Sequence, residues 1–144
     1  MERLKEALSA AGIAYKENEP LCAHCTFRIG GPADLFVLPE NEEQLCAAIR
    51  LAKEAGVKSY LLGNGSNILF EDAGYRGAVI NVSAMKSGIG VIENISFPGK
   101  DPALTYDAVV VGAGQMLSSL CMAALENSLT GLEFAYGIPG TVGG

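Results

Sequence analysis

Five small polar residues in succession form the segment of this sequence best suited to holding an anion. They are Gly63, Asn64, Gly65, Ser66 and Asn67. Glycine allows positive φ angles and close backbone approach, so successive N–H groups can converge on a phosphate. No charged residue lies between Lys58 and Glu71, so backbone dipoles and neutral side chains would have to hold the anion. A simple tight turn is the alternative, but a turn needs fewer such residues, and the run favours a phosphate-binding loop.

A second glycine-rich segment covers residues 137–144. It reads Gly137, Ile138, Pro139, Gly140, Thr141, Val142, Gly143 and Gly144. Glycine at this density usually reflects close backbone approach to a ligand. A flexible linker, the alternative, would consist of Gly and Ser, whereas Ile138, Pro139 and Val142 stiffen this stretch. The segment is therefore a second candidate ligand loop.

A third candidate, Gly112 and Gly114, lies between a predicted strand and a predicted helix. This is the position of a Rossmann dinucleotide fingerprint, but Leu117 stands where the third glycine should be. No clear strand with an acidic end follows the helix. An NAD-binding Rossmann domain is therefore an alternative with little support, and a tight strand-to-helix turn is equally compatible with the residues.

The elements that would position these loops follow from hydrophobic periodicity. Residues 2–11 predict a helix, residues 16–20 a polar connector and residues 33–38 a strand. A second helix is capped by Asn41, with Gln44 at the capping-box position, and Gly56 closes it. A buried strand at Ser59–Leu62 completes a β–α–β order, which implies a parallel pair. Later predictions are strands at 78–82, 88–95 and 106–111, a hairpin-like loop at 96–105 and a helix at 117–127. The expected class is α+β with an α/β-like first half.

The composition is that of a folded protein. The chain has 144 residues, 49% hydrophobic and 18% charged, which allows one domain with a real core. Its net charge of −6 argues against nucleic acid or an anionic membrane as the main partner. Residues 1–8 are charged and lack the apolar segment of a signal peptide, and residues 108–125 contain too many Gly and Ser for a membrane span, so we expect a cytoplasmic protein. Residues 101–144 contain no Lys or Arg, so they could not clamp a second anionic ligand.

Four cysteines are present, and reduced thiols are expected in the absence of an export signal. Cys22 and Cys25 have CxxC spacing with His24 between them, which could indicate zinc or redox chemistry. A zinc site needs a second ligand pair, and Cys46 and Cys121 fall in separate predicted helices. We therefore expect a loop with two incidental thiols and no metal site.

Three motifs together resemble a known family. They are residues 26–33 (TFRIGGPA), 62–69 (LGNGSNIL) and 131–144 (GLEFAYGIPGTVGG), in that order. The set closely resembles the UDP-N-acetylenolpyruvoylglucosamine reductases, flavoenzymes of bacterial peptidoglycan synthesis. The resemblance implies an FAD-binding fold of the p-cresol methylhydroxylase type, which is not a Rossmann domain. It also implies that residues 63–67 hold the FAD pyrophosphate, that residues 137–143 run along the flavin, and that residues 112–114 lie near the cofactor. The cofactor-binding candidates are Leu62, Gly63, Asn64, Gly65, Ser66, Asn67, Ile68, Gly112, Gly114, Gly137, Ile138, Pro139, Gly140, Thr141 and Gly143.

The resemblance further implies reduction of an enolpyruvyl ether on a UDP-sugar with electrons from NADPH. In the family, the proton-donating serine and the arginine and glutamate that polarise the substrate come after the stretch matching residues 137–144. No catalytic residue is therefore assigned here. We expect residues 1–144 to be one truncated FAD-binding domain, inactive alone, which binds the UDP-sugar only with the missing portion and which could self-associate through its exposed core.

Three points remain open from the sequence. Arg28, inside the first motif, could contact the cofactor or form a structural ion pair. An FAD-linked hydroxy-acid oxidase of the same fold is an alternative function. A non-catalytic nucleotide-binding module is another, and it would bind its ligand without flavin reduction.

Overall fold

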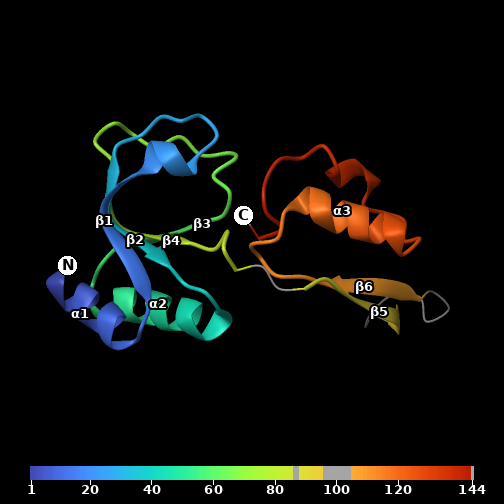
Figure 1. The fold of residues 1–144 in the computed structure, drawn as a ribbon, viewed down its shortest axis with the longest axis horizontal. Helices are drawn as coiled ribbons and strands as arrows, with labels where there is room; N and C mark the ends of the chain where they lie inside the picture. Colours follow the sequence, from blue (N-terminus) through green and yellow to red (C-terminus); the bar gives the residue numbers. More distant parts are fainter. Residues whose placement is uncertain (86–87, 96–104, 144) are drawn as a thin grey trace.

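The structure of the chain, a computed structural model, describes residues 1–85, 88–95 and 105–143. Its elements form two parts (Figure 1): α1 to β4, and β5 to η2. In chain order they are α1 (Glu2–Ala10), β1 (Ala14–Pro20), the 3-10 turn η1 (Leu21–His24), β2 (Pro32–Leu38), α2 (Glu42–Glu54), β3 (Ser59–Leu62), β4 (Tyr75–Asn81), β5 (Gly90–Ile95), β6 (Tyr106–Val110), α3 (Leu117–Glu126) and the 3-10 turn η2 (Glu133–Ala135). The loop predicted at 96–105 lies outside the described residues, except for Thr105.

The first part contains a four-stranded sheet in the order β1-β2-β4-β3. β1 runs antiparallel to β2, whereas β2 and β3 both pair in parallel with β4. The predicted β–α–β unit is present, but its two strands are not neighbours, because β4 lies between them. β4 is buried along most of its length and β3 is not, so the more apolar strand takes the central position.

Two predictions about individual strands are wrong. Residues 16–20, predicted as a polar connector, form most of β1. β3 was predicted to be buried, yet Tyr60 is 41% and Leu61 53% exposed, and only Leu62 is buried. Both strands lie at sheet edges, where polar or exposed side chains are tolerated, so hydrophobic pattern alone misjudges them.

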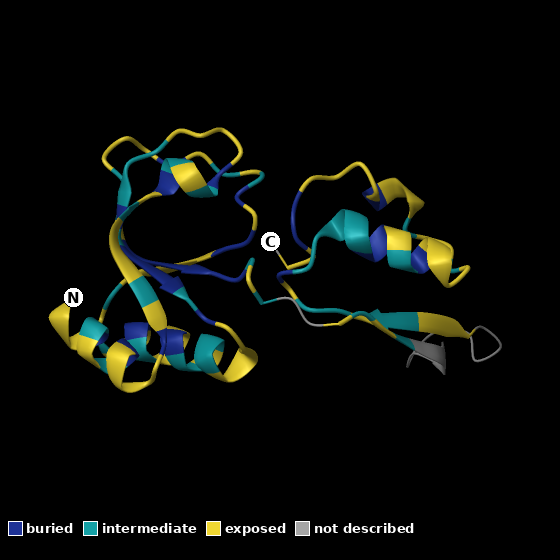
Figure 2. Ribbon diagram, in the orientation of Figure 1, coloured by how far each residue is buried: buried dark blue, intermediate teal, exposed yellow. Residues whose placement is uncertain are grey.

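Helices cover one face of this sheet and two loops cover the other. Figure 2 shows the central strands buried between these layers. The first core joins α1 and α2 to the sheet through Leu4, Leu8, Ile13, Leu35, Val37, Ala48, Ala52, Ala78 and Ile80. The second joins the opposite face to the loops through Leu21, Cys25, Ala33, Phe36, Leu62, Phe70 and Val79. This second core fixes the loop after η1 and the loop after β3 against the same surface.

The helix predictions agree closely with the structure. In α2, the Gln44 N–H donates to Asn41 Oδ1 at 2.9 Å, and Gln44 Oε1 accepts from the Glu40 N–H at 2.9 Å. Asn41 therefore caps the helix as predicted, whereas the Gln44 side chain bonds the N–H one residue before the cap and not that of Asn41 itself. α1 is tied to β1 by Lys5, whose Nζ lies 2.7 Å from carboxylate oxygens of both Glu2 and Glu17.

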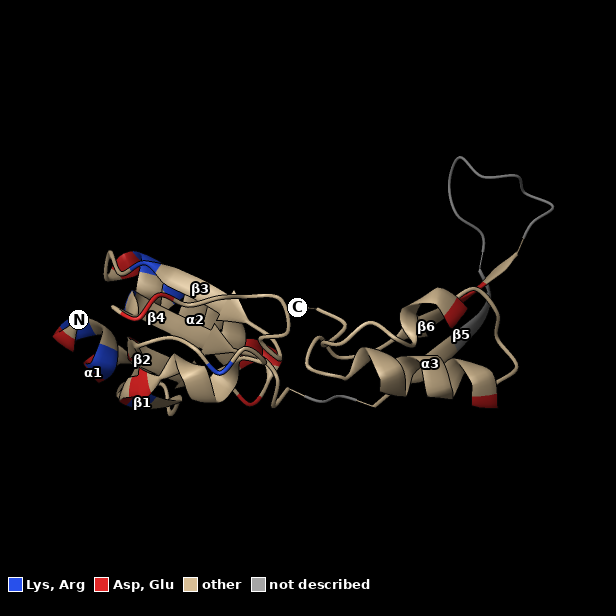
Figure 3. Cartoon of the chain, turned by 90° about the horizontal axis from the view of Figure 1, so that it is seen from above, with Lys and Arg blue, Asp and Glu red and all other residues tan. Residues whose placement is uncertain are grey.

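In the second part, β5 and β6 form an antiparallel pair, with α3 alongside it (Figure 1). β6 is therefore not a strand of a parallel sheet, and the turn at Gly112 does not open a Rossmann unit. The predicted class, α+β and not Rossmann, is confirmed. Among the described residues of this part the charged side chains are acidic (Figure 3). No helix in the described part of the chain is long and apolar enough to cross a membrane.

Candidate functional site

Two glycine-rich segments that are far apart in the sequence line one pocket of about 370 Å³. The first is residues 62–68, which begin at the last residue of β3, and the second is residues 138–140. Tyr60 and Leu61 complete the lining. No charged side chain is among the described residues that line this pocket. The first two candidate loops of the sequence therefore meet in space.

Backbone N–H groups of residues 63–67 have no acceptor among the described residues. Gly63 and Gly65 are buried, and the side chain of Asn64 donates to Ser66 Oγ at 3.3 Å. Consecutive N–H groups without internal acceptors form the arrangement that binds phosphate oxygens.

The shape of this loop is held by contact with the segment after η1. The Thr26 N–H donates to the Gly65 carbonyl at 3.0 Å, and Thr26 Oγ1 donates to the Ser66 carbonyl at 3.2 Å. Gly65 has φ +64°, and a Cβ atom there would lie 2.1 Å from the His24 carbonyl oxygen. Only glycine fits this position, because both the backbone conformation and the space exclude a side chain.

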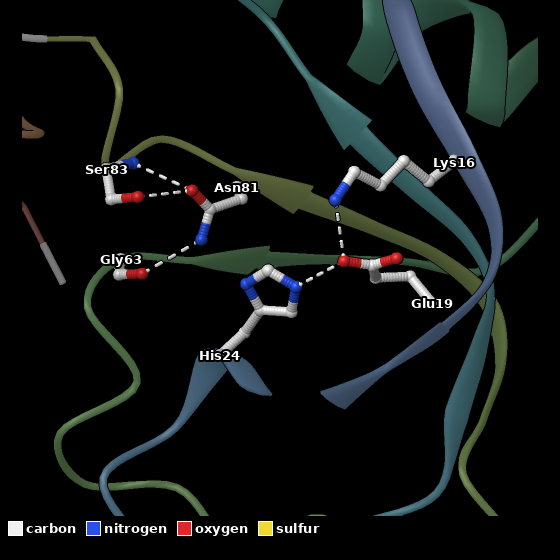
Figure 4. A network of polar contacts seen from close by, with 6 residues as sticks. All are labelled: Lys16, Glu19, His24, Gly63, Asn81 and Ser83. Atoms are coloured by element: carbon white, nitrogen blue, oxygen red, sulfur yellow. Dashed lines mark hydrogen bonds and ion pairs between the residues drawn. The ribbon is translucent and has the colours of Figure 1, made fainter. Parts of the chain in front are cut away.

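Asn81, at the end of β4, holds the start of the loop (Figure 4). Its Nδ2 donates to the Gly63 carbonyl at 3.0 Å, and its Oδ1 accepts bonds from the N–H and the hydroxyl of Ser83. Asn81 is only 5% exposed. The sequence analysis missed Asn81, Ser83 and the bonding role of Thr26, although an amide that ends an apolar strand was a usable signal.

A second pocket, of about 440 Å³, shares Gly63 and Asn64 with the first. Its other lining residues are Ala23, His24, Cys25, Thr26, Arg28, Asn81 and Ser83. The His24 ring stacks on Phe36 with centroids 4.0 Å apart, and its Nε2 lies 2.8 Å from Glu19 Oε1. Lys16 Nζ donates to the same oxygen at 2.8 Å (Figure 4). The hydrogen bonds from Lys16 and then His24 hold the pKa of the Glu19 carboxyl below its usual value.

The turn at Gly112 and Gly114 packs against the second glycine-rich segment. The Gly143 N–H donates to the Ala113 carbonyl at 3.0 Å, and the Leu117 N–H donates to the Gly140 carbonyl at 3.0 Å. A Cβ at Gly114 would lie 2.2 Å from the Val82 carbonyl oxygen, so this glycine serves backbone packing. Gly112, Gly114 and Gly143 do not line the 370 Å³ pocket.

Thr141 of the second segment and Gly112 of the turn differ in their surroundings. Thr141 is 4% exposed, and its Oγ1 has no hydrogen-bond partner within the described residues. Gly112 lines a separate pocket of about 550 Å³ with Glu40, Asn41 and Met85 among others. The structure thus divides the predicted site residues into those at the shared pocket and those that support it or lie elsewhere.

The CxxC motif lies in and just after η1. Cys25 belongs to the second apolar core, and its Sγ donates to the Ile29 carbonyl at 3.3 Å. Across the residues that the structure describes, no three His, Cys, Asp or Glu side chains gather as metal ligands. Cys25 is thus a core residue that also closes the turn leading to Ile29.

Comparison with known sequences identifies curated relatives over nearly the whole chain. The chain is 38% identical over 149 residues to UDP-N-acetylenolpyruvoylglucosamine reductase of Clostridium perfringens, covering 100% of the chain and 44% of the relative. It is 42% identical over 127 residues to the reductase of Alkaliphilus oremlandii, covering 88% of the chain and 38% of the relative. The resemblance seen in the three motifs is thereby confirmed, and the chain spans less than half the length of these relatives.

Solved structures share the same fold. The crystal structure of UDP-N-acetylenolpyruvylglucosamine reductase (MurB) from Thermus caldophilus matches with a TM-score of 0.58 and 28% identity, over 92% of this chain and 40% of that one. BBE-like 1 of Physcomitrella patens matches with a TM-score of 0.56 and 25% identity, over 87% and 26% of the two chains. A VAO-type flavoprotein of Myceliophthora thermophila, at 17% identity and a TM-score of 0.55 over 69% and 18%, shows the fold alone. A family profile described as FAD binding domain matches residues 33–144, and the chain therefore belongs to the family of FAD-binding domains.

Proposed function

We propose that this chain is the FAD-binding portion of an NADPH-dependent reductase of cell-wall synthesis. The reductase would convert the enolpyruvyl group of UDP-N-acetylglucosamine enolpyruvate to UDP-N-acetylmuramate. Identities of 38% and 42% to named reductases support this substrate. The observation that carries the cofactor assignment is the meeting of residues 62–68 and 138–140 at one pocket.

The donors around this pocket fit a dinucleotide that carries a diphosphate. Residues 63–67 offer five N–H groups without described acceptors, and no acidic side chain lines the pocket. The buried hydroxyl of Thr141, next to Gly140, has no described partner and could bond a polar edge of the cofactor. We propose that residues 63–67 bind the diphosphate and that the second segment orients the flavin. The proposed cofactor-binding residues are Leu62, Gly63, Asn64, Gly65, Ser66, Asn67, Ile68, Gly112, Gly114, Gly137, Ile138, Pro139, Gly140, Thr141 and Gly143, with Gly112, Gly114 and Gly143 in supporting positions.

The chemistry that bound FAD supplies is two-electron transfer between NADPH and the substrate. This chain would bind the cofactor, orient it and exclude water from one side of the cofactor. We propose no proton donor or substrate-polarising group within residues 1–144. The UDP-sugar would be bound, and the reaction completed, only together with the portion of the reductase that the chain does not span, in the cytoplasm. The chain alone would be inactive.

A second candidate, an FAD-linked hydroxy-acid oxidase, is favoured only by the shared fold. The TM-scores to VAO-type and BBE-like structures are 0.55 and 0.56, close to the 0.58 found for the reductase. Sequence identity separates the two functions. The curated reductases are 38% and 42% identical to the chain, whereas these structural neighbours are only 17% and 25% identical to it. We therefore place the reductase first. A non-catalytic module would bind flavin but never become reduced within a complete protein.

An absorbance and fluorescence titration of the purified chain with FAD tests the cofactor assignment, with NAD in parallel. Circular dichroism first establishes that the chain is folded. We expect FAD to bind with shifted absorbance bands and quenched emission, and NAD not to bind. A folded chain that bound NAD and not FAD, or neither, would contradict the proposal.

A further inference from the structure

Arg28 is exposed and lines the 440 Å³ pocket that shares Gly63 and Asn64 with the proposed FAD pocket. A structural ion pair was one expectation for Arg28, but none of the described carboxylates pairs with it. Asp34, a carboxylate of the entry strand β2, is paired with Arg76 at 2.7 Å. Within the described residues, Arg28 therefore carries an unpaired positive charge, and it shares a pocket with Gly63 and Asn64 of the proposed diphosphate-binding loop.

The backbone at Arg28 is in an unfavourable conformation. Its φ is +55°, with its N–H donating to the Cys25 carbonyl at 3.2 Å. Among described residues other than glycine, only Asn18 and Ser128 also have positive φ, and Asn tolerates this region because its short side chain bonds locally. A long side chain has no such compensation. Strained conformations of this kind persist where surrounding structure fixes them and are concentrated at functional sites.

The charge around the two pockets makes Arg28 distinctive. Among the described residues that line either pocket, Arg28 is the only lysine or arginine. The chain as a whole has a net charge of −6, which opposes the approach of an anion. Neutral N–H donors alone would have to bind two negative phosphates against this field. A guanidinium beside the pocket would offset this negative field and form charge-assisted hydrogen bonds with phosphate.

We propose that Arg28 is a binding residue that supplies the positive charge for the FAD diphosphate, while residues 63–67 supply the neutral donors. The inference depends on the proposed function, because it specifies how that same site recognises its cofactor. It assigns to the first motif a role in affinity that is separate from the structural role of Thr26.

The test is FAD titration of the wild-type chain and three variants across a range of NaCl from about 0.02 to 0.5 M, where screening becomes strong. Arg28→Gln removes the charge and keeps a Cβ atom, so the backbone at φ +55° is equally strained in both chains. Arg28→Lys keeps the charge. Arg50→Gln makes the same change of net charge on α2, at a residue that pairs with Glu54 and lines neither pocket.

We expect Arg28→Gln to weaken FAD binding about tenfold at low salt, as loss of one charge-assisted contact would. Its salt dependence should be flatter than that of the wild type. Arg28→Lys should retain most of both properties, and Arg50→Gln should match the wild type. Thermal melts followed by circular dichroism establish that each variant is folded.

Two outcomes would overturn the role of Arg28 while leaving the FAD assignment intact: wild-type affinity in Arg28→Gln, or weaker binding with an unchanged salt dependence. If Arg28→Gln did not fold, Arg28→Lys would decide, because loss of salt dependence in that variant contradicts a charge role. A folded wild-type chain that failed to bind FAD would overturn the proposed function and the inference together.

Discussion

Replacement of Gly65 by alanine tests whether the two loops are in contact as described. A Cβ at Gly65 would lie 2.1 Å from the carbonyl oxygen of His24 and 2.8 Å from Cys25 Cα. Both are backbone atoms, so neither can rotate away as a side chain could. The segment after η1 or the loop at residues 63–67 would have to move.

The expected cost has two parts that a control variant separates. An alanine at φ +64° costs about 1 kcal/mol for its left-handed conformation. The steric overlap adds about 2 kcal/mol, as for other overpacking substitutions. Gly12 has φ +66° and no atom within 4 Å of its Cβ position, so Gly12→Ala has the first cost alone. We expect free energies of unfolding lower by about 3 kcal/mol for Gly65→Ala and about 1 kcal/mol for Gly12→Ala.

Urea unfolding followed by circular dichroism measures both values, and a thermal melt should show Tm lower by about 10 °C in Gly65→Ala and about 3 °C in Gly12→Ala. FAD affinity should fall in Gly65→Ala only, because that substitution displaces the donors of residues 63–67. Equal destabilisation in the two variants would refute the close contact between the loops. Unchanged FAD affinity in a clearly destabilised Gly65→Ala would refute the link between loop shape and binding.

Three further predictions concern buried polarity, pH and association. Asn81→Asp replaces the donor that bonds the Gly63 carbonyl by an acceptor, so we expect the free energy of unfolding at pH 7 to fall by about 2 kcal/mol in urea melts, and no change would count against the bond. The pKa of Glu19 is lowered by Lys16 and the neighbouring imidazole, so this carboxylate stabilises the fold above its unfolded pKa and less as pH falls through its folded pKa. Glu19→Gln should therefore be less stable than the wild type at pH 7, and the difference should shrink as the pH falls below about 4 toward the lowered pKa, whereas a constant difference would contradict the linkage. Leu125 is 68% exposed on α3, so sedimentation should show self-association that Leu125→Lys reduces, and a monomeric wild type would contradict this expectation.

Local signals predicted the elements whose determinants are close together in the chain. Asn41 and Gln44 marked the start of α2. The side-chain cap by Asn41 is present as expected, while Gln44 bonds the N–H of Glu40. The strand at residues 106–111 and the following helix were also found, within one residue at their boundaries. Edge strands were harder to judge, because β1 presents mostly polar side chains that resemble a loop.

The sequence by itself determined the candidate ligand loops and the family resemblance. Glycine spacing and small polar side chains are properties of single segments, and three motifs in order are specific enough to show a resemblance. Only the tertiary structure decided which loops meet, because contacts between residues near 64 and residues near 139 depend on the path of the whole chain. It also decided why Gly65 must be glycine, since the excluding atom belongs to His24, and that Arg28 pairs with none of the described carboxylates. Hydrophobic periodicity indicates which face of a helix or strand is buried. The residues that contact it from distant parts of the chain depend on how the sheet and its covering loops pack together.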